Sequence, residues 1–233
     1  MSEAKTPGTD AGDAAGSLTE KQISDVALTI LDAGGRQALS VRAVAQRLGV
    51  DAAAVHAHVG SSDGLERAVI ERVLSSVALG PLTDDGVEWT AAVVQFALSV
   101  RGRLFDHPAV PELIMSGPLD SPSADGPAAR EMAESLFVCL ARGGLPAPIR
   151  AHGVYAVIVY VLGSIALDVA ETDGKLPLPG ESERIATRRA ALHDLDPTRW
   201  PRAAAHLEEI AAWTSVDQFV WGLRVLLVGM TAT

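Results

Sequence analysis

Histidine is a common metal ligand, so closely spaced histidines are the first residues to consider for a metal site. Two closely spaced histidines, His56 and His58, lie in the stretch VDAAAVHAHVGSSDGL, residues 50–65. If this stretch is helical, positions i and i+2 point to different faces, whereas a metal ion needs its ligands on one side. The spacing therefore predicts no metal site at these histidines.

The single cysteine, Cys139, lies inside the apolar run SLFVCLA. A thiol in such surroundings packs as a small hydrophobic side chain, and one cysteine cannot form an intramolecular disulfide. No P-loop pattern and no H-E-x-x-H zinc pattern occurs in the chain. We therefore predict that the protein is not an enzyme and has no cofactor, and the lone thiol fits a reducing cytoplasm.

The charge distribution separates a nearly neutral N-terminal region from an acidic remainder. The 233 residues carry a formal net charge of -10, of which residues 18–75 contribute -1. Such a balance argues against a protein that coats nucleic acid without specificity. It is compatible with a small DNA-facing head on an acidic body.

Helix signals begin at Thr19, which forms a capping-box pattern with Gln22. Apolar residues then recur at helical spacing until Gly34 and Gly35, which we expect to end the first helix. Ser40 is expected to cap a second helix, Gly49 to form a tight turn and Asp51 to cap a third helix, to about residue 58. A fourth helix is capped within residues 61–63 and ends at the Gly-Pro pair of residues 80 and 81.

Longer helical patterns occupy the rest of the chain. We expect helices at 84–105, 109–116, 127–142, 148–170, 200–212 and 215–230. Segments 117–126 and 171–197 are rich in Pro, Gly and acidic residues and are predicted to be loops. No strand-like alternation persists, so the predicted fold class is all-α. The predicted organisation is a disordered tail (1–17), a helix-turn-helix head (18–63) and a larger helical domain (64–233).

The head resembles the DNA-binding domain of the TetR family of transcriptional repressors. The resemblance rests on AGGRQALSVRAVAQRLGV and on HAHV, where the family has Tyr-x-His-Phe or Tyr-x-His-Val. Near the C-terminus, SVDQFVWGLRVLLVGM looks like the last helix of the family's ligand domain, and HPAVPEL and DPTRWPRAAAH also look like segments of it. The resemblance implies a homodimeric repressor that binds a double-stranded DNA operator and is released by a small-molecule effector.

Matched position by position, the resemblance implies ten DNA-binding residues. Ser40 and Val41 stand where the family contacts phosphate, and Arg42 stands where some members place an arginine on guanine. The remaining positions are those of the recognition helix and of a family lysine that is a serine here: Ala52, Ala53, Ala54, His56, Ala57, His58 and Ser62. Alternatively, Arg42 is a solvated arginine and the alanines serve only as helix formers.

Large and polar side chains of the C-terminal domain are candidate ligand contacts, because a small-molecule pocket is mostly apolar with a few polar groups. These candidates are Trp89, Phe96, Arg103, Leu104, His107, Met115, Phe137, His152 and Tyr155. Ordinary core packing is the alternative for each large side chain. We expect an apolar, drug-like effector.

Two strongly apolar helices, 154–169 and 216–229, are predicted to form a four-helix dimer interface. The candidate interface residues are Val157, Val161, Ile165, Phe219, Leu223 and Leu226. The alternative is that both helices are internal core. Residues 151–170 are also long enough to span a bilayer, but they contain His152 and Asp168 and lack flanking lysines, so we expect no membrane partner.

The function predicted from the sequence is that of a cytoplasmic, ligand-responsive DNA-binding regulator. The alternative is a ligand- or protein-binding module of the same fold whose specific DNA binding is weakened or lost. That alternative is motivated by the cation-poor segment of residues 50–65.

Overall fold

The computed structural model describes residues 18–116, 126–172, 174 and 176–232. Within these ranges the chain forms helices and no strand, which confirms the predicted all-α class. The predicted disordered tail, residues 1–17, lies outside the described residues. In chain order the helices are α1 (Glu20–Ala38), α2 (Val41–Leu48), α3 (Ala52–Val59), α4 (Ser62–Leu74), α5 (Gly80–Thr83), α6 (Trp89–Asp106), α7 (Val110–Ser116), α8 (Pro127–Arg142), α9 (Ala147–Ala170), α10 (Glu181–Ala191), α11 (Pro201–Ala205), α12 (Leu207–Ala211) and α13 (Val216–Thr231).

The caps of the first helices are those expected from the sequence. Thr19 and Gln22 form the reciprocal capping box of α1, Ser40 caps α2, and Asp51 caps α3. The regular part of α1 ends at the Gly34–Gly35 pair, as predicted, and α1 extends beyond a kink there to Ala38. Gly35 has a left-handed φ of 67°, which breaks the helix, and one more helical turn follows to Ala38.

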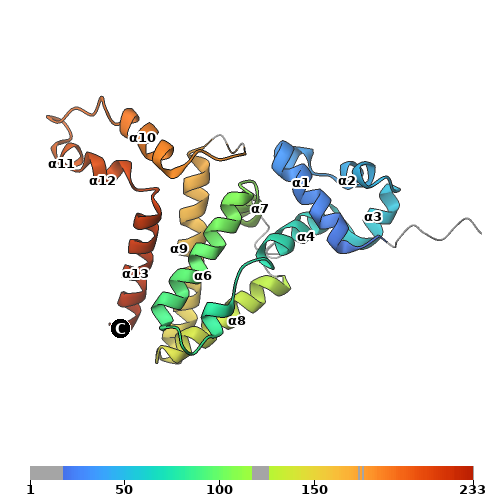
Figure 1. Ribbon diagram of the computed structural model, residues 1–233, viewed down its shortest axis with the longest axis horizontal. Coiled ribbons are helices and arrows are strands. Elements are labelled where there is room, and N and C mark those ends of the chain that lie inside the picture. Colours follow the sequence, from blue (N-terminus) through green and yellow to red (C-terminus); the bar gives the residue numbers. More distant parts are fainter. Residues whose placement is uncertain (1–17, 117–125, 173, 175, 233) are drawn as a thin grey trace, which may run out of the picture.

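Helices α1, α2 and α3 form a head at one end of the molecule (Figure 1). Their inward faces share a core with the first half of α4, including the fully buried Ile23, Leu31, Val44, Val55 and Leu65. Figure 1 shows α4 leading from this head toward the larger bundle of α6, α8, α9 and α13. The two halves are therefore connected by a helix that packs in both.

In the bundle, α9 packs against α6, α8 and α13. The crossing of α9 and α13 is close because Gly222 has no side chain. A Cβ added there would lie 2.3 Å from the hydroxyl of Tyr160. That hydroxyl donates a hydrogen bond of 2.8 Å to the carbonyl of Phe219, and the two rings stack.

Several predicted boundaries in the C-terminal domain are wrong. The fourth helix ends at Leu74, and the Gly-Pro pair of residues 80 and 81 begins α5 instead of ending α4, because proline is favoured in the first turn of a helix. Helix α6 begins at Trp89, not at residue 84, because the side chain of Glu88 caps it.

The predicted loop 171–197 contains α10. This helix has no buried residue, so no apolar stripe marked it in the sequence. The single helix expected over 200–212 is divided into α11 and α12. Most of the other predicted loop, 117–126, lies outside the described residues.

A buried ion pair joins α6 to α9. Arg101 donates to Asp168 at 3.1 Å, and each side chain is 9% exposed. The same guanidinium lies 4.2 Å from the centre of the Phe105 ring. Burial raises the pKa of Asp168, while Arg101 acts to lower it. The pair is enclosed by protein, so each charge depends on the other for compensation.

Among the described residues, α9 is long and apolar enough to cross a membrane by length and composition, with a mean hydropathy of 2.0. The core helix of a soluble protein meets the same criterion. Because α9 packs against three helices of the bundle and carries the buried Asp168, we assign it as a bundle helix.

Replacing Asp168 by alanine leaves the buried guanidinium of Arg101 without its carboxylate. We expect the free energy of unfolding, measured by denaturant titration, to fall by about 3–5 kcal/mol. The matched control is Asp106→Ala, which removes an exposed pair with Arg103 and should cost less than about 1 kcal/mol. Similar small losses in both variants would contradict the assigned importance of the buried pair.

Candidate functional site

The two helices of the predicted DNA-binding motif are held at a fixed angle by a tight turn. Gly49 follows α2 with φ 70° and ψ 29°, a left-handed conformation that glycine adopts without strain. The side chain of Asp51 then accepts a hydrogen bond of 2.7 Å from the amide of Ala53 and starts α3. Only Val55 of α3 is buried, so the rest of this short helix faces outward or lies at the edge of the core.

The structure leaves most of the predicted DNA-binding residues accessible. Ser40, Val41 and Ala54 are partly buried, and the exposed ones are Arg42, Ala52, Ala53, His56, Ala57, His58 and Ser62. Arg42 makes no ion pair with any described residue. The hydroxyl of Ser40 is engaged in capping α2, where it accepts from the amide of Ala43 at 3.1 Å. Chemically, this surface offers methyl groups, two imidazoles and one guanidinium.

Residues Gly60 to Gly64, at the junction of α3 and α4, match the G-x-S-x-G spacing of a hydrolase nucleophile. That chemistry needs a turn between a strand and a helix, whereas this segment joins two helices. The central serine of the match, Ser62, is the first residue of α4, and Ser61 before it caps this helix by accepting from the amide of Gly64 at 3.0 Å. The match is therefore a helix cap and does not indicate catalysis.

Polar contacts tie the head to the rest of the molecule at the kinked end of α1. Arg36 donates to both carboxylate oxygens of Glu66 on α4, at 2.9 and 3.1 Å. It also donates to the hydroxyl of Ser116 at the end of α7, at 3.0 Å. The Glu66 carboxylate raises the pKa of the Arg36 guanidinium, so this arginine stays charged. A second contact joins Asp32 of α1 to His107 after α6, at 2.9 Å.

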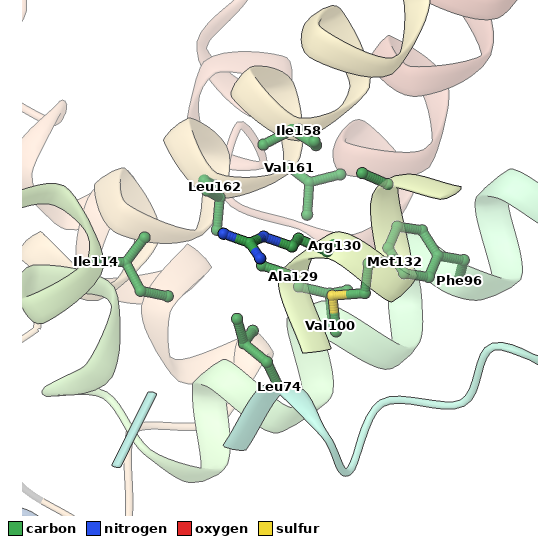
Figure 2. A pocket seen from close by; sticks show the side chains of 11 residues that line it. Leu74, Phe96, Val100, Ile114, Ala129, Arg130, Met132, Ile158, Val161 and Leu162 are labelled. Atoms are coloured by element: carbon green, nitrogen blue, oxygen red, sulfur yellow. The ribbon is translucent and has the colours of Figure 1, made fainter. Parts of the chain in front are cut away.

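The bundle contains an apolar cavity of about 260 Å³ beside the end of α4. Figure 2 shows its side chains, which come from α4, α6, α7, α8 and α9. The lining residues are Leu74, Phe96, Val100, Ile114, Ala129, Arg130, Met132, Ala133, Ile158, Val161 and Leu162. The cavity is thus placed where a bound molecule would contact both the bundle and the helix that leads to the head.

Of the predicted ligand-binding residues, the structure brings only Phe96 to this cavity. Leu104 is fully buried elsewhere in the core, whereas Met115 and Tyr155 are 61% and 71% exposed. The polar candidates also have other surroundings: Arg103 pairs with Asp106, His107 contacts Asp32, and His152 is exposed. The ring of Trp89 packs against Gly143, and Phe137 is 37% exposed on α8.

The sequence analysis ranked candidates by side-chain size, and this is why it missed most of the lining. A cavity requires small side chains beside large ones, and Ala129 and Ala133 provide that space on α8. Together with Met132 they follow the i, i+3, i+4 spacing of one helix face. This spacing is the feature of the sequence that could have identified the α8 wall of the cavity. No comparable pattern in the sequence marks Leu74 or Ile114 as lining residues.

The structure places most of the predicted interface residues inside the chain. Val157, Val161, Ile165, Phe219 and Leu223 are all buried, and Leu226 is partly buried. Their side chains fill the contacts of α9 with its neighbours and of α13 with α9, so they are not available at the surface. The exposed apolar residues of these helices are Tyr155, Val159 and Leu167 on α9, and Trp221, Val225 and Val228 on α13.

The comparison with known proteins agrees with this arrangement. A family model described as the tetracyclin repressor-like C-terminal domain matches residues 81–233. The chain belongs to the TetR family. Family members are regulators of transcription and not enzymes, as the sequence indicated. The matched region lies inside the predicted C-terminal domain.

The relatives of this TetR-family chain include proteins of known structure. A curated HTH-type transcriptional regulator of Saccharopolyspora erythraea is 31% identical over 152 residues, which are 65% of this chain and 61% of that protein. The TetR family protein ActR of Streptomyces coelicolor, solved with actinorhodin, is 26% identical with a TM-score of 0.75, over 92% of this chain and 97% of ActR. ActR with (S)-DNPA is 25% identical with the same TM-score, over 93% of this chain and 98% of ActR.

The turn of the helix-turn-helix head can be tested by a pair of glycine substitutions. Gly49→Ala forces a Cβ onto a left-handed residue, and we expect the free energy of unfolding to fall by about 1 kcal/mol or more. The control, Gly102→Ala, lies in α6 with no atom within 4 Å of the added Cβ, and should raise stability by up to about 1 kcal/mol. Urea denaturation followed by circular dichroism measures both, and a stable Gly49→Ala variant would contradict the turn geometry.

Proposed function

We propose that this TetR-family chain is a cytoplasmic one-component repressor. In this proposal a homodimer binds a palindromic operator with its two heads, and a small, mainly apolar molecule in the cavity releases it. The observation that carries the proposal is that α4 packs under the DNA-facing head at one end and lines an apolar cavity at the other.

The contacts along α4 supply a physical route from the cavity to the head. Leu74 and Ile114 are both cavity-lining residues, on α4 and α7. Arg36 of the head is bound by Glu66 of α4 and by Ser116 of α7. A molecule that displaces Leu74 or Ile114 therefore acts on the two helices that hold Arg36, and it can change the angle of the head. A ligand shifts the equilibrium between the DNA-binding state and the released state only by the difference in its affinity for the two states.

ActR crystallised with actinorhodin and with (S)-DNPA supports a small-molecule effector for this chain. The lining of the cavity supports a mainly apolar one, because ten of its eleven residues are uncharged. Filling such a cavity removes apolar surface of the molecule from water, at about 25 cal/mol per Å².

The DNA surface in this proposal depends on few cations. Arg42 and Arg47 are exposed on α2, whereas α3 offers alanine methyl groups and histidines. Methyl groups can contact thymine, and an arginine can make two hydrogen bonds to guanine. Backbone amides at the N-termini of α2 and α4 can contact phosphate in place of lysines. Affinity is therefore expected to require both heads of a dimer.

The exposed apolar residues of α9 and α13 support the homodimer. Trp221, Val225 and Val228 follow the i, i+4, i+7 spacing of one face of α13, and each is more than half exposed. Tyr155 and Val159 form a similar stripe on α9. Two copies of these two helices would bury both stripes in a four-helix interface.

DNA binding is tested by selecting bound fragments from a genomic library and measuring the enriched site by mobility shift. We expect a palindromic site, and we expect Arg42→Ala to weaken its binding by about 1–3 kcal/mol per head. Arg103→Ala, which removes an exposed arginine of the body, should bind as the wild type does. If no fragment is enriched, the chain is instead a ligand- or protein-binding module without specific DNA binding.

The dimer is tested by sedimentation velocity at micromolar concentration. Val225→Glu would place two carboxylates in the proposed interface, where they lose hydration without gaining a partner, and we expect monomers. Val50→Glu introduces the same charge at a partly exposed valine of the head and should remain dimeric. A Val225→Glu protein that sediments as a dimer would exclude this face as the interface.

A further inference from the structure

Helix α8, which forms one wall of the cavity, begins without a capping side chain of its own. Its N-cap residue is Gly126, which has no side chain to accept a hydrogen bond from the first amides. The acceptor comes from α4 instead, because the carboxylate of Glu71 accepts a hydrogen bond of 2.9 Å from the amide of Ala128. A Cβ added at Gly126 would lie 2.3 Å from the other oxygen of this carboxylate, so the glycine leaves the space that Glu71 occupies. The first turn of α8 is thus bound to the helix that leads to the head.

The contact between Glu71 and α8 is of a kind that holds two helices in a defined direction. The first amides of a helix have no partner within it, and they carry a partial positive charge. A carboxylate that accepts from such an amide makes a charge-assisted hydrogen bond, which is stronger than a bond between neutral groups. Because a hydrogen bond depends on its angle as well as on its length, a displaced first turn of α8 either draws Glu71 with it or loses the bond.

The neighbours of Glu71 on α4 bind the head. Arg72, the next residue, donates to the carboxylate of Asp25 on α1 at 2.5 Å. Nearer the start of α4, Glu66 binds Arg36 at the kinked end of α1. Helix α1 is therefore held on α4 at two places by ion pairs, and one of them is adjacent in sequence to the residue that holds α8.

The capped turn of α8 also belongs to the cavity. Ala129, Met132 and Ala133 line the cavity from α8, and Ala129 directly follows the residue whose amide Glu71 binds. A molecule that fills the cavity beside these three residues presses on the first two turns of α8. The bond to Glu71 lies within the same turns, so it experiences any displacement of this wall.

We propose that Glu71 is the positioning residue through which the α8 wall of the cavity acts on the head. This inference rests on the proposed function, because it concerns how a molecule in the same cavity regulates the head. It adds a route to the apolar contacts at Leu74 and Ile114. Those side chains can yield to a ligand by rotation about their own bonds, whereas the carboxylate of Glu71 is tied to the backbone of α8.

The test uses the neutral apolar fluorophore N-phenyl-1-naphthylamine as a probe and measures amide hydrogen exchange of the full chain with and without it. In the wild type, we expect the bound probe to change exchange rates in α8 and, by about fivefold or more, in α1. In Glu71→Ala the change in α8 should remain, and the change in α1 should fall below about twofold. Gly126→Ala, which displaces the carboxylate but keeps its charge, should behave in the same way. Glu134→Ala removes an exposed carboxylate of α8 and should respond as the wild type does.

The comparison with and without probe separates positioning from a purely structural role. If Glu71 only stabilised α8, its loss would raise exchange in both conditions and would leave the effect of the probe on α1 unchanged. Probe affinity, measured by fluorescence titration, should stay within about threefold in Glu71→Ala, because coupling between two sites can be lost without loss of binding at either. Circular dichroism establishes that each variant is folded.

The outcomes also distinguish this inference from the proposed function. If the probe does not bind, or if Ala133→Leu, which fills the cavity, binds it as the wild type does, the proposed effector cavity fails and this inference fails with it. The same holds if the bound probe changes exchange only within the bundle. If the probe changes α1 equally in the wild type and in Glu71→Ala, the cavity still acts on the head and the role of Glu71 is wrong. A response of α1 that is lost in Glu71→Ala and Gly126→Ala but kept in Glu134→Ala supports the proposal.

Discussion

Helix α4 is the element on which the rest of this structure depends, because it belongs to two cores at once. Leu65 and Val69 pack under the head, while Leu74 closes one side of the cavity in the bundle. Between them, Glu66 holds Arg36 at the kink of α1. A rigid helix cannot move at one end alone, so the position of the head is linked to the packing around the cavity. Under the proposed function, this linkage lets a molecule bound in the cavity change the position of the head.

A second constraint concerns α9, because different faces of this one apolar helix lie in different environments. One face is buried and includes Val157 and Ile165, another lines the cavity through Ile158 and Leu162, and a third is exposed at Tyr155 and Leu167. The buried pair of Arg101 and Asp168 fixes this helix against α6. An ion pair contributes less net stability than apolar packing of the same volume, but it penalises any register that separates the two charges.

The exposed face of α3, in the head, consists mainly of small side chains. Ala52, Ala53 and Ala57 stabilise a short helix and allow a close approach to whatever it contacts. The small number of cations limits nonspecific attraction to phosphate, which depends on the number of phosphates neutralised. Under the proposed function, recognition by this head relies on shape and on a few directed contacts at Arg42 and the helix N-termini.

The sequence by itself determined the all-α class, the caps at Thr19, Ser40 and Asp51, and the glycine turn of the head. These features depend on residues within a few positions of one another, so local patterns report them. The exposure of Arg42 on α2 followed from the same local reasoning.

The cavity and the exposed faces of α9 and α13 were decided only by the tertiary structure. Val161 is equally apolar whether it faces a dimer partner, the core or a cavity, and only the packing of α4, α6, α8 and α9 places it at the cavity. The residues next to Arg130 in the sequence likewise do not indicate that it lines the cavity. An apolar pattern states that a side chain avoids water, but the neighbours that cover it come from distant parts of the chain.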